Sequence, residues 1–291
     1  MKVWLDGRVM DASEARIPVI DHGFLYGDGV FEGIRVYSRR VFRLERHLER
    51  LATSALSIGL EIPGGLDAMR AVVIETVRAF GADESYVRLI VSRGDGPLGV
   101  DPLLCPAPRV VCLVDQVQLY SAEKLARGLD LVTASVRRPP PDVLDPRVKS
   151  LNYLNSVLAK REAKLRGADE ALILNHAGQI AEASVANVFL VRRGVLLTPP
   201  ATDGALEGVT RSTVLELATE LGVPHREATV GRIDLFGADE AFLTGTGARV
   251  VAIGSLDGAP LRGSVPGPVT ARIDAAFRER TRVDGVPIDD A

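Results

Sequence analysis

Cysteine, histidine and lysine are all scarce in this sequence. Its 291 residues include only two cysteines, Cys105 and Cys112, and four histidines, at positions 22, 47, 176 and 225. Two cysteines cannot form a disulfide framework, and the histidines are too scattered to join them as ligands, so the sequence predicts no metal site. We expect both cysteines to pack as small apolar side chains.

Long apolar runs and a strong excess of charge are also missing. Apolar residues make up 46% of the chain, but no stretch approaches the roughly 20 consecutive apolar residues that span a bilayer. The start, MKVWLDGRVMDASEARIPV, lacks the uninterrupted apolar segment of a signal peptide. A formal net charge of -3 gives no broad attraction to nucleic acid or to an anionic membrane. We therefore expect a cytoplasmic globular protein with small-molecule partners, and neither nucleic acid nor membrane among them.

Helical and strand-like patterns are irregularly interleaved, which favours an α+β or mixed α/β protein with mixed sheets. We expect a small N-terminal α+β domain over residues 1–115, a linker over 116–128, a large domain over 129–282 and a frayed tail over 283–291. The spacing predicts helices over 44–60, 66–82, 152–167 and 208–222. It predicts strands over 30–38, 40–44, 85–93, 109–117, 129–136 and 170–175, and strand pairs within 186–199 and 239–253.

The stretch RGDGPLG raises the possibility of a nicotinamide-dependent oxidoreductase. Its glycines, Gly94, Gly96 and Gly99, have the spacing of the dinucleotide fingerprint and follow a predicted strand. That fingerprint needs a helix to begin at the glycines, because the helix N-terminus holds the pyrophosphate. The following VDPLLCPAPR is too rich in proline for such a helix, so we expect a loop here.

Lys149 stands out because only five lysines accompany thirty arginines. Lys160 and Lys164 lie four residues apart on the predicted helix 152–167, as solvated lysines commonly do. Lys149 instead precedes that helix, after the proline-broken RRPPPDVLDPRV. A lysine, unlike an arginine, can lose its proton and form an imine with an aldehyde. Taken alone, Lys149 fits either a surface lysine at a helix start or a Schiff-base residue.

Six motifs along the chain together resemble one enzyme group, the fold type IV pyridoxal-phosphate enzymes. This group comprises the branched-chain and D-amino-acid aminotransferases and aminodeoxychorismate lyase, and the resemblance is greatest to the branched-chain aminotransferases. It covers roughly residues 3 to 280 and rests on YGDGVFEGIRVY, YVRLIVSRG, DPRVKSLNYLNSVLAK, EASVANVFLV, LEGVTRSTVLELA and FLTGTGARV.

The resemblance implies a two-domain, pyridoxal 5'-phosphate-dependent aminotransferase that assembles as a homodimer or a higher homo-oligomer. The implied reaction moves an amino group between a branched-chain L-amino acid and 2-oxoglutarate by a ping-pong route. Transfer from D-amino acids and the lyase reaction, which needs no acceptor, stay open as alternatives.

The resemblance also implies roles for individual residues. Lys149 matches the Schiff-base lysine, Glu182 the carboxylate at the pyridine nitrogen and Tyr153 the phenol at the ring hydroxyl. The phosphate site would comprise Arg50, Val209, Thr210, Gly245 and Thr246. Substrate contacts would come from Tyr26, Phe31, Gly33, Arg35, Tyr86, Arg88, Leu98, Val100 and Gly247, with the loop at Leu98, Gly99 and Val100 reaching the neighbouring subunit's site. From the residues alone, Arg50 could equally be a solvated helix arginine, Glu182 an exposed strand-end glutamate and the glycine turn a tight connection.

Two departures from the branched-chain pattern bear on the substrate. Arg249 stands where GTAAE would place a glutamate, and Ala183 and Ser184 follow Glu182 where a glycine and a small residue are usual. An arginine beside the expected carboxylate site reverses a local charge and could recruit a second carboxylate or shift the preference toward D-amino acids. Alternatively, Arg249 faces solvent and changes nothing.

Overall fold

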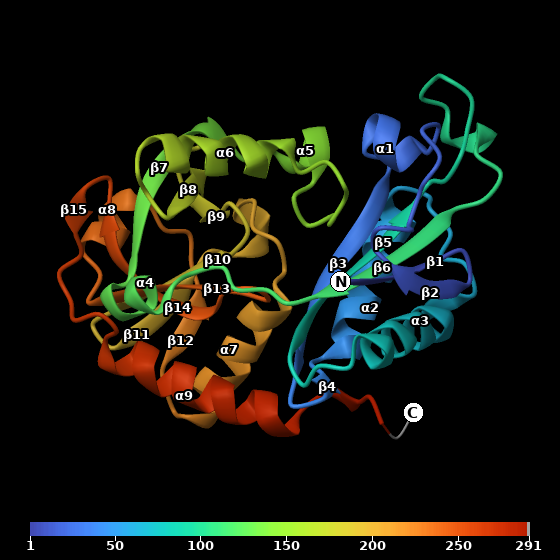
Figure 1. Ribbon diagram of the computed structural model, residues 1–291. Helices are drawn as coiled ribbons and strands as arrows, with labels where there is room; N and C mark the ends of the chain where they lie inside the picture. Colours follow the sequence, from blue (N-terminus) through green and yellow to red (C-terminus); the bar gives the residue numbers. More distant parts are fainter. Residues whose placement is uncertain (290–291) are drawn as a thin grey trace. The chain divides into compact units, whose positions relative to one another are not determined.

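A computed structural model describes residues 1–289, and the chain divides into two compact units (Figure 1). Unit 1 comprises Met1–Val117, Val148–Asn152 and the chain from Thr281 onward, and unit 2 comprises Gln118–Arg147 and Tyr153–Arg280. The predicted linker, residues 116–128, contains the border at 117/118 and also a short helix, α4 (Ala122–Arg127). Lys149 thus belongs to unit 1, although the chain on both sides of its segment belongs to unit 2.

Unit 1 is built on an antiparallel sheet. Within residues 1–289 this sheet has seven strands in the order β16-β4-β3-β5-β6-β1-β2, each antiparallel to its neighbours. The strands are β1 (Lys2–Leu5), β2 (Arg8–Asp11), β3 (Gly29–Tyr37), β4 (Arg40–Val41), β5 (Ser85–Ser92), β6 (Arg109–Asp115) and β16 (Val286–Pro287). The helices are α1 (His22–Tyr26), α2 (Leu44–Ser57) and α3 (Gly65–Phe80), with a 3-10 turn at Pro102–Leu104.

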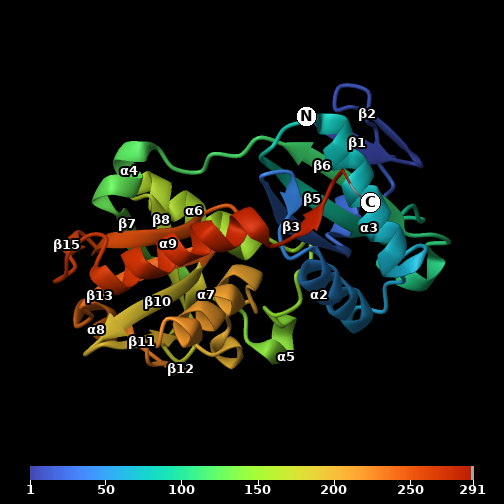
Figure 2. The ribbon, with the colours of Figure 1, turned by 90° about the horizontal axis from the view of Figure 1, so that it is seen from below.

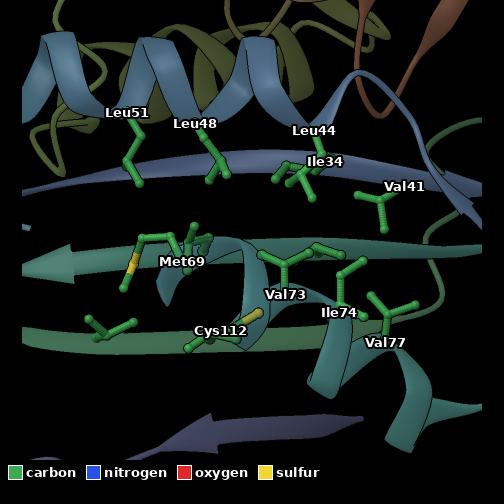
Figure 3. Packing of buried hydrophobic residues seen from close by; sticks show 14 of the residues in the cluster. Ile34, Val41, Leu44, Leu48, Leu51, Met69, Val73, Ile74, Val77 and Cys112 are labelled. Atoms are coloured by element: carbon green, nitrogen blue, oxygen red, sulfur yellow. The ribbon is translucent and has the colours of Figure 1, made fainter. Parts of the chain in front are cut away.

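Helices α2 and α3 lie side by side and cover one face of this sheet (Figures 1 and 2). The predicted stripe of α2 is buried there, with Leu44, Leu48 and Leu51 at most 1% exposed. Figure 3 shows these leucines and residues of α3 packed over the strands, with Cys112 of β6 among them. Burial raises the pKa of the Cys112 thiol to about 12, so this cysteine is an apolar core residue, as predicted. Cys105 is only half-buried.

Unit 2 contains a mixed sheet, as the interleaved pattern predicts. In the described part of the chain it has nine strands, ordered β12-β11-β10-β13-β14-β7-β8-β9 with β15 paired to β14. The β11–β12, β14–β7 and β7–β8 pairs are parallel and the others antiparallel. The strands are β7 (Leu129–Arg137), β8 (Glu170–Leu174), β9 (Ile180–Ala183), β10 (Asn187–Arg192), β11 (Val195–Thr198), β12 (His225–Glu227), β13 (Glu240–Gly245), β14 (Arg249–Leu256) and β15 (Ala259–Pro260). The remaining helices are α5 (Pro141–Leu144), α6 (Leu154–Leu165), α7 (Val209–Glu220), α8 (Arg232–Phe236) and α9 (Pro268–Val283), with a 3-10 turn at Ala201–Asp203.

The structure corrects the interpretation of the C-terminal residues as frayed. Residues 284–289 follow α9, and β16 pairs with β4. Ile288 is fully buried in the core of unit 1, and Asp289 pairs with Arg39. The tail was misjudged because RVDGVPIDDA is short and polar, and its partner strand lies more than 240 residues away in sequence. Positions 290 and 291 of the predicted tail lie outside the described residues.

The stretch RGDGPLG forms a loop after β5, as its prolines predict, and the next helical residues are a single 3-10 turn. No helix within residues 1–289 is both long and apolar enough to cross a membrane.

The packing of α2 leads to a stability prediction. Leu48→Ala removes a 1% exposed side chain from the core and should lower the free energy of unfolding by about 2–5 kcal/mol. Leu56→Ala on the same helix is the matched control, because Leu56 is 81% exposed and its loss should change stability by less than about 0.5 kcal/mol. Urea unfolding measures both. Equal losses for the two variants would contradict this packing.

Candidate functional site

The backbone of Lys149 is fixed to strand β3 of unit 1. Phe31 N–H donates to the Lys149 carbonyl (3.0 Å), and Leu151 N–H donates to the Gly29 carbonyl (2.9 Å). The Lys149 N–H donates to Ser54 Oγ on α2 at 3.1 Å. These bonds hold the segment Val148–Asn152 like a short additional strand, so the lysine side chain starts from a defined position.

Two cationic side chains approach the ring of Phe31. Lys149 Nζ and the Arg88 guanidinium carbon each lie 4.4 Å from the ring centroid. Tyr86 lies across Gly33, and Arg88 Nη2 donates to Tyr86 Oη at 3.3 Å. A Cβ atom at position 33 would lie 2.1 Å from Tyr86 Oη, so only glycine fits beneath the phenol. Of the predicted substrate residues, Phe31 therefore contacts the lysine amine, and Arg88 contacts the same ring beside Tyr86 and Gly33.

Arg35 of β3 has structural contacts of its own. Its Nη1 donates to the Val117 carbonyl at 3.2 Å, and its Nη2 pairs with Glu84 at 3.3 Å. Its guanidinium also lies 5.2 Å from the centroid of the Tyr37 ring. These contacts tie β3 to Glu84 and to the end of the segment Met1–Val117, and the predicted contact of Arg35 with substrate stays a prediction.

Tyr26 connects α1 to the loop that contains Leu98 and Val100. Its phenol oxygen accepts from Gly99 N–H at 2.9 Å, while Leu98 and Val100 point away from the core of unit 1, 84% and 79% exposed. The three predicted residues are thus brought together in one exposed feature of unit 1.

Arg50 on α2 is held by a buried carboxylate that the sequence analysis did not identify. Its Nε and Nη2 donate to the two oxygens of Glu32, both at 2.7 Å. His47 Nδ1 lies 2.7 Å from Glu32 Oε2. Burial alone would raise the pKa of Glu32, but the charge and hydrogen bonds of Arg50 and His47 outweigh it and lower that pKa, so Glu32 is ionised. Burial lowers the pKa of His47 despite the attraction of Glu32.

Glu182 of β9 is the corresponding buried carboxylate in unit 2. Its Oε1 accepts from Arg138 Nη2 at 2.9 Å, and its Oε2 accepts from Leu206 N–H (3.1 Å) and from Asn187 Nδ2 (3.3 Å). Arg138 is itself fixed by Asn155 Oδ1 at 2.8 Å. A carboxylate with this set of donors is held in one orientation and in its ionised form. The alternative of an exposed strand-end glutamate is wrong, because Glu182 is buried.

Asn187 connects this carboxylate to the N-terminus of α7, because its side chain contacts both Glu182 and Gly208. Gly208 is the N-cap residue, and it supplies no side-chain cap to the first N–H groups of the helix, which include those of Val209 and Thr210. A Cβ atom at position 208 would lie 2.1 Å from Asn187 Oδ1, so the close approach requires glycine. An uncapped helix start of this kind is a favourable position for an anion such as a phosphate.

Strand β13 ends at Gly245, and the turn that joins it to β14 contains Thr246 and Gly247. It is joined to the same region because Asn187 pairs with Thr244 across the sheet, and a Cβ atom on Gly245 would lie 3.2 Å from the Val185 carbonyl. Arg249 closes the turn with a left-handed backbone (φ 62°), a conformation that costs about 1 kcal/mol or more in an ordinary residue.

Tyr153 is the N-cap residue of α6, and its carbonyl accepts from Val157 N–H at 2.9 Å. It is the first residue of unit 2 after the Lys149 segment. The described chain contains no group of three histidine, cysteine or acidic side chains suited to a metal ion.

Two sets of predicted residues are thus assembled, one in each unit. Unit 1 brings together Lys149, Phe31, Gly33, Tyr86 and Arg88, and unit 2 brings together Glu182, Val209, Thr210, Gly245 and Thr246. Five further residues of these sets were not predicted from the sequence: Glu32, His47, Ser54, Arg138 and Asn187. A charged residue in the apolar run VFEGIRV was a signal for Glu32, and a histidine on the apolar stripe of α2 was one for His47. Arg138 and Asn187 gave no local signal.

The donor set fits pyridoxal phosphate. An imine-forming amine, a buried ionised carboxylate, an uncapped helix start and a glycine turn with a hydroxyl are the groups that this cofactor needs for its carbonyl, its ring nitrogen and its phosphate.

Comparisons with known proteins agree with this donor set. Residues 29–256 match the model of the class IV amino-transferases. The chain is 42% identical over 290 residues, all of both chains, to a protein of Methanocaldococcus jannaschii named putative branched-chain-amino-acid aminotransferase. It is 32% identical over 278 residues, 96% of both chains, to a D-alanine aminotransferase of Bacillus licheniformis.

A solved structure shows the same fold. The branched-chain amino acid aminotransferase from Thermobaculum terrenum, in its PLP form, has a TM-score of 0.86 at 33% identity, covering 97% of this chain and 94% of that chain. The chain belongs to the class IV aminotransferases, which are the fold type IV group of pyridoxal-phosphate enzymes. The predicted family, fold class and enzyme class are confirmed.

The Arg138–Glu182 pair leads to a second stability prediction. Arg138→Met leaves the Glu182 carboxylate buried without its cation and should cost about 3–5 kcal/mol. Adding Glu182→Leu removes the stranded charge, so the double variant should recover part of this loss. Arg192→Met, which breaks the exposed pair with Asp234, is the control and should cost less than about 1 kcal/mol. In urea unfolding, a double variant as unstable as Arg138→Met would show that the carboxylate does not need this cation.

Proposed function

We propose that this enzyme transfers an amino group between a branched-chain L-amino acid and 2-oxoglutarate, using pyridoxal 5'-phosphate. The observation that carries the proposal is the position of the Lys149 amine at Phe31, whose ring also contacts the cationic Arg88 beside Tyr86. An apolar ring beside a cation is suited to a substrate with an apolar side chain and a carboxylate. The similarity to proteins named branched-chain aminotransferases supports this choice.

Each residue then has a defined task. When bound, the cofactor supplies an aldehyde for the amine and a ring that accepts electrons from the bond broken at the substrate α-carbon. Lys149 would bind that aldehyde and, once the substrate amine has displaced it, would take the proton from the substrate α-carbon and deliver it to the cofactor carbon that held the aldehyde. Glu182 would keep a proton on the ring nitrogen, and Tyr153 would donate to the ring hydroxyl.

Phosphate binding falls to the guanidinium of Arg50, the first N–H groups of α7 at Val209 and Thr210, and the turn at Gly245 and Thr246. The two substrates use the same lysine one after the other, because the oxo acid made from the first leaves before the second enters. This is the ping-pong order.

A second candidate is transfer from D-amino acids. The likeness to a D-alanine aminotransferase and the presence of Arg249, held in a strained turn beside Gly247, both favour it. An arginine here would attract a carboxylate that the branched-chain pattern, with a glutamate at this position, would repel. The lyase reaction is the remaining alternative within the family.

We propose that the protein acts as a homodimer. Unit 1 exposes apolar side chains on α1 and the neighbouring loop, which the Tyr26–Gly99 bond joins. They are Phe24 (67% exposed), Leu98 (84%), Val100 (79%) and Leu103 (89%). Exposed apolar side chains on neighbouring segments commonly mark a protein interface, and a second copy of the chain is the partner that the family implies. The cytoplasmic location stays a prediction, with which the two free cysteines agree.

Chemical labelling tests the cofactor and its lysine. Borohydride reduction of the protein with pyridoxal phosphate should fix one pyridoxyl group on Lys149, because this amine alone carries the cofactor. Peptide mapping by mass spectrometry locates the label. Lys149→Ala should abolish it, whereas Lys164→Ala should retain it, since that residue lies on helix α6 near the Ala168 carbonyl. A label on Lys160 or Lys164, or none, would refute the assignment.

A side-by-side assay tests the substrate. At a fixed 2-oxoglutarate concentration, kcat/KM should be highest for L-leucine or a close relative, because the apolar ring of Phe31 lies beside the Arg88 cation. Faster turnover of D-alanine or D-glutamate than of every L-branched substrate would establish the D-specific reaction instead. Release of pyruvate from aminodeoxychorismate without an added 2-oxo acid would establish the lyase.

A further inference from the structure

Glu32 is a charged residue inside the apolar core of unit 1. Its neighbours at alternate positions on β3, Val30 and Ile34, are both 0% exposed, and so is Glu32 itself. Placing a carboxylate here costs several kcal/mol unless it is paired and hydrogen-bonded with good geometry. Glu32 has no task of its own in the proposed reaction.

Both oxygens of Glu32 are used to hold other side chains. Arg50 donates from Nε and Nη2 in a two-pronged arrangement with both distances at 2.7 Å, and His47 closes on Oε2 at 2.7 Å. Such a fork fixes the plane of a guanidinium as well as its position. Arg46 on the same helix shows the contrast, since its side chain is 64% exposed and pairs with the exposed Glu49.

Strand β3 links this fork to the lysine. Phe31 and Glu32 are consecutive, so their side chains point to opposite faces of the strand. Phe31 contacts Lys149 through its N–H and through its ring, while Glu32 holds Arg50 on the α2 face. Two adjacent residues of one strand therefore set the positions of the amine and of the proposed phosphate anchor.

We infer that Glu32 is a positioning residue that fixes Arg50 relative to Lys149, so that the phosphate and the aldehyde of one pyridoxal phosphate are held together. His47 completes the arrangement by fixing the carboxylate. This inference rests on the proposed function and deepens it, because it makes phosphate affinity depend on a residue that does not touch the cofactor.

The test compares cofactors with and without the phosphate. Glu32→Asp keeps the negative charge but withdraws the carboxylate by one methylene, so the fork with Arg50 is lost or displaced. The dissociation constant of pyridoxal phosphate, measured by equilibrium dialysis, should rise about tenfold, the equivalent of one charge-assisted hydrogen bond. The dissociation constant of pyridoxal, which lacks the phosphate, should not change. Glu49→Asp on the exposed side of α2 is the matched control and should leave both constants unchanged.

A second variant tests the inference if Glu32→Asp does not fold. His47→Phe leaves Glu32 and Arg50 unchanged and keeps a ring of similar size, but it removes the contact that fixes Glu32. It should weaken binding of pyridoxal phosphate more than binding of pyridoxal. An equal loss for both cofactors, or no loss, overturns the inference. The unmodified protein separates failure of this inference from failure of the proposed function. If it binds pyridoxal phosphate and carries the label on Lys149, an equal loss or no loss in the variants overturns only the role of Glu32. If it does not bind pyridoxal phosphate, the proposed function itself fails.

Discussion

The hydrogen bonds between the Lys149 segment and β3 are the constraint on which the proposed site depends. Five residues, Val148–Asn152, leave the chain of unit 2 and join unit 1, where their backbone pairs with β3 and Ser54 of α2. A lysine on a free loop would sample many positions. Here its Cα atom is fixed by main-chain bonds, so the amine needs only its own side-chain torsions to reach one place at the Phe31 ring.

Each unit also buries a carboxylate and offsets its charge with an arginine, Arg50 for Glu32 and Arg138 for Glu182. The two pairs differ in the donors that complete them. Glu32 has His47, whereas Glu182 has a backbone N–H and the Asn187 amide. Guanidinium groups thus hold both buried carboxylates, whereas the imine chemistry proposed for Lys149 requires an amine.

Much of this fold could be predicted from local pattern, because the period of the apolar residues identifies an amphipathic helix such as α2 and a hairpin such as β10–β11. Helix α9 escaped prediction because its apolar residues are few among many charges, and β16 because its partner is remote in sequence. The site divides in the same way. Motif resemblance pointed to Lys149 and Glu182, but no local pattern marks Arg138 among thirty arginines, since its contact with Glu182 spans 44 residues and exists only in the folded chain.

The account is tested most directly by an absorbance spectrum of the purified protein with pyridoxal phosphate. If Lys149 binds the cofactor and the enzyme is an aminotransferase, a visible band of the bound cofactor should disappear when L-leucine is added and return when 2-oxoglutarate follows. A spectrum that contains no such band, or one that amino acids leave unchanged, would contradict the central claim.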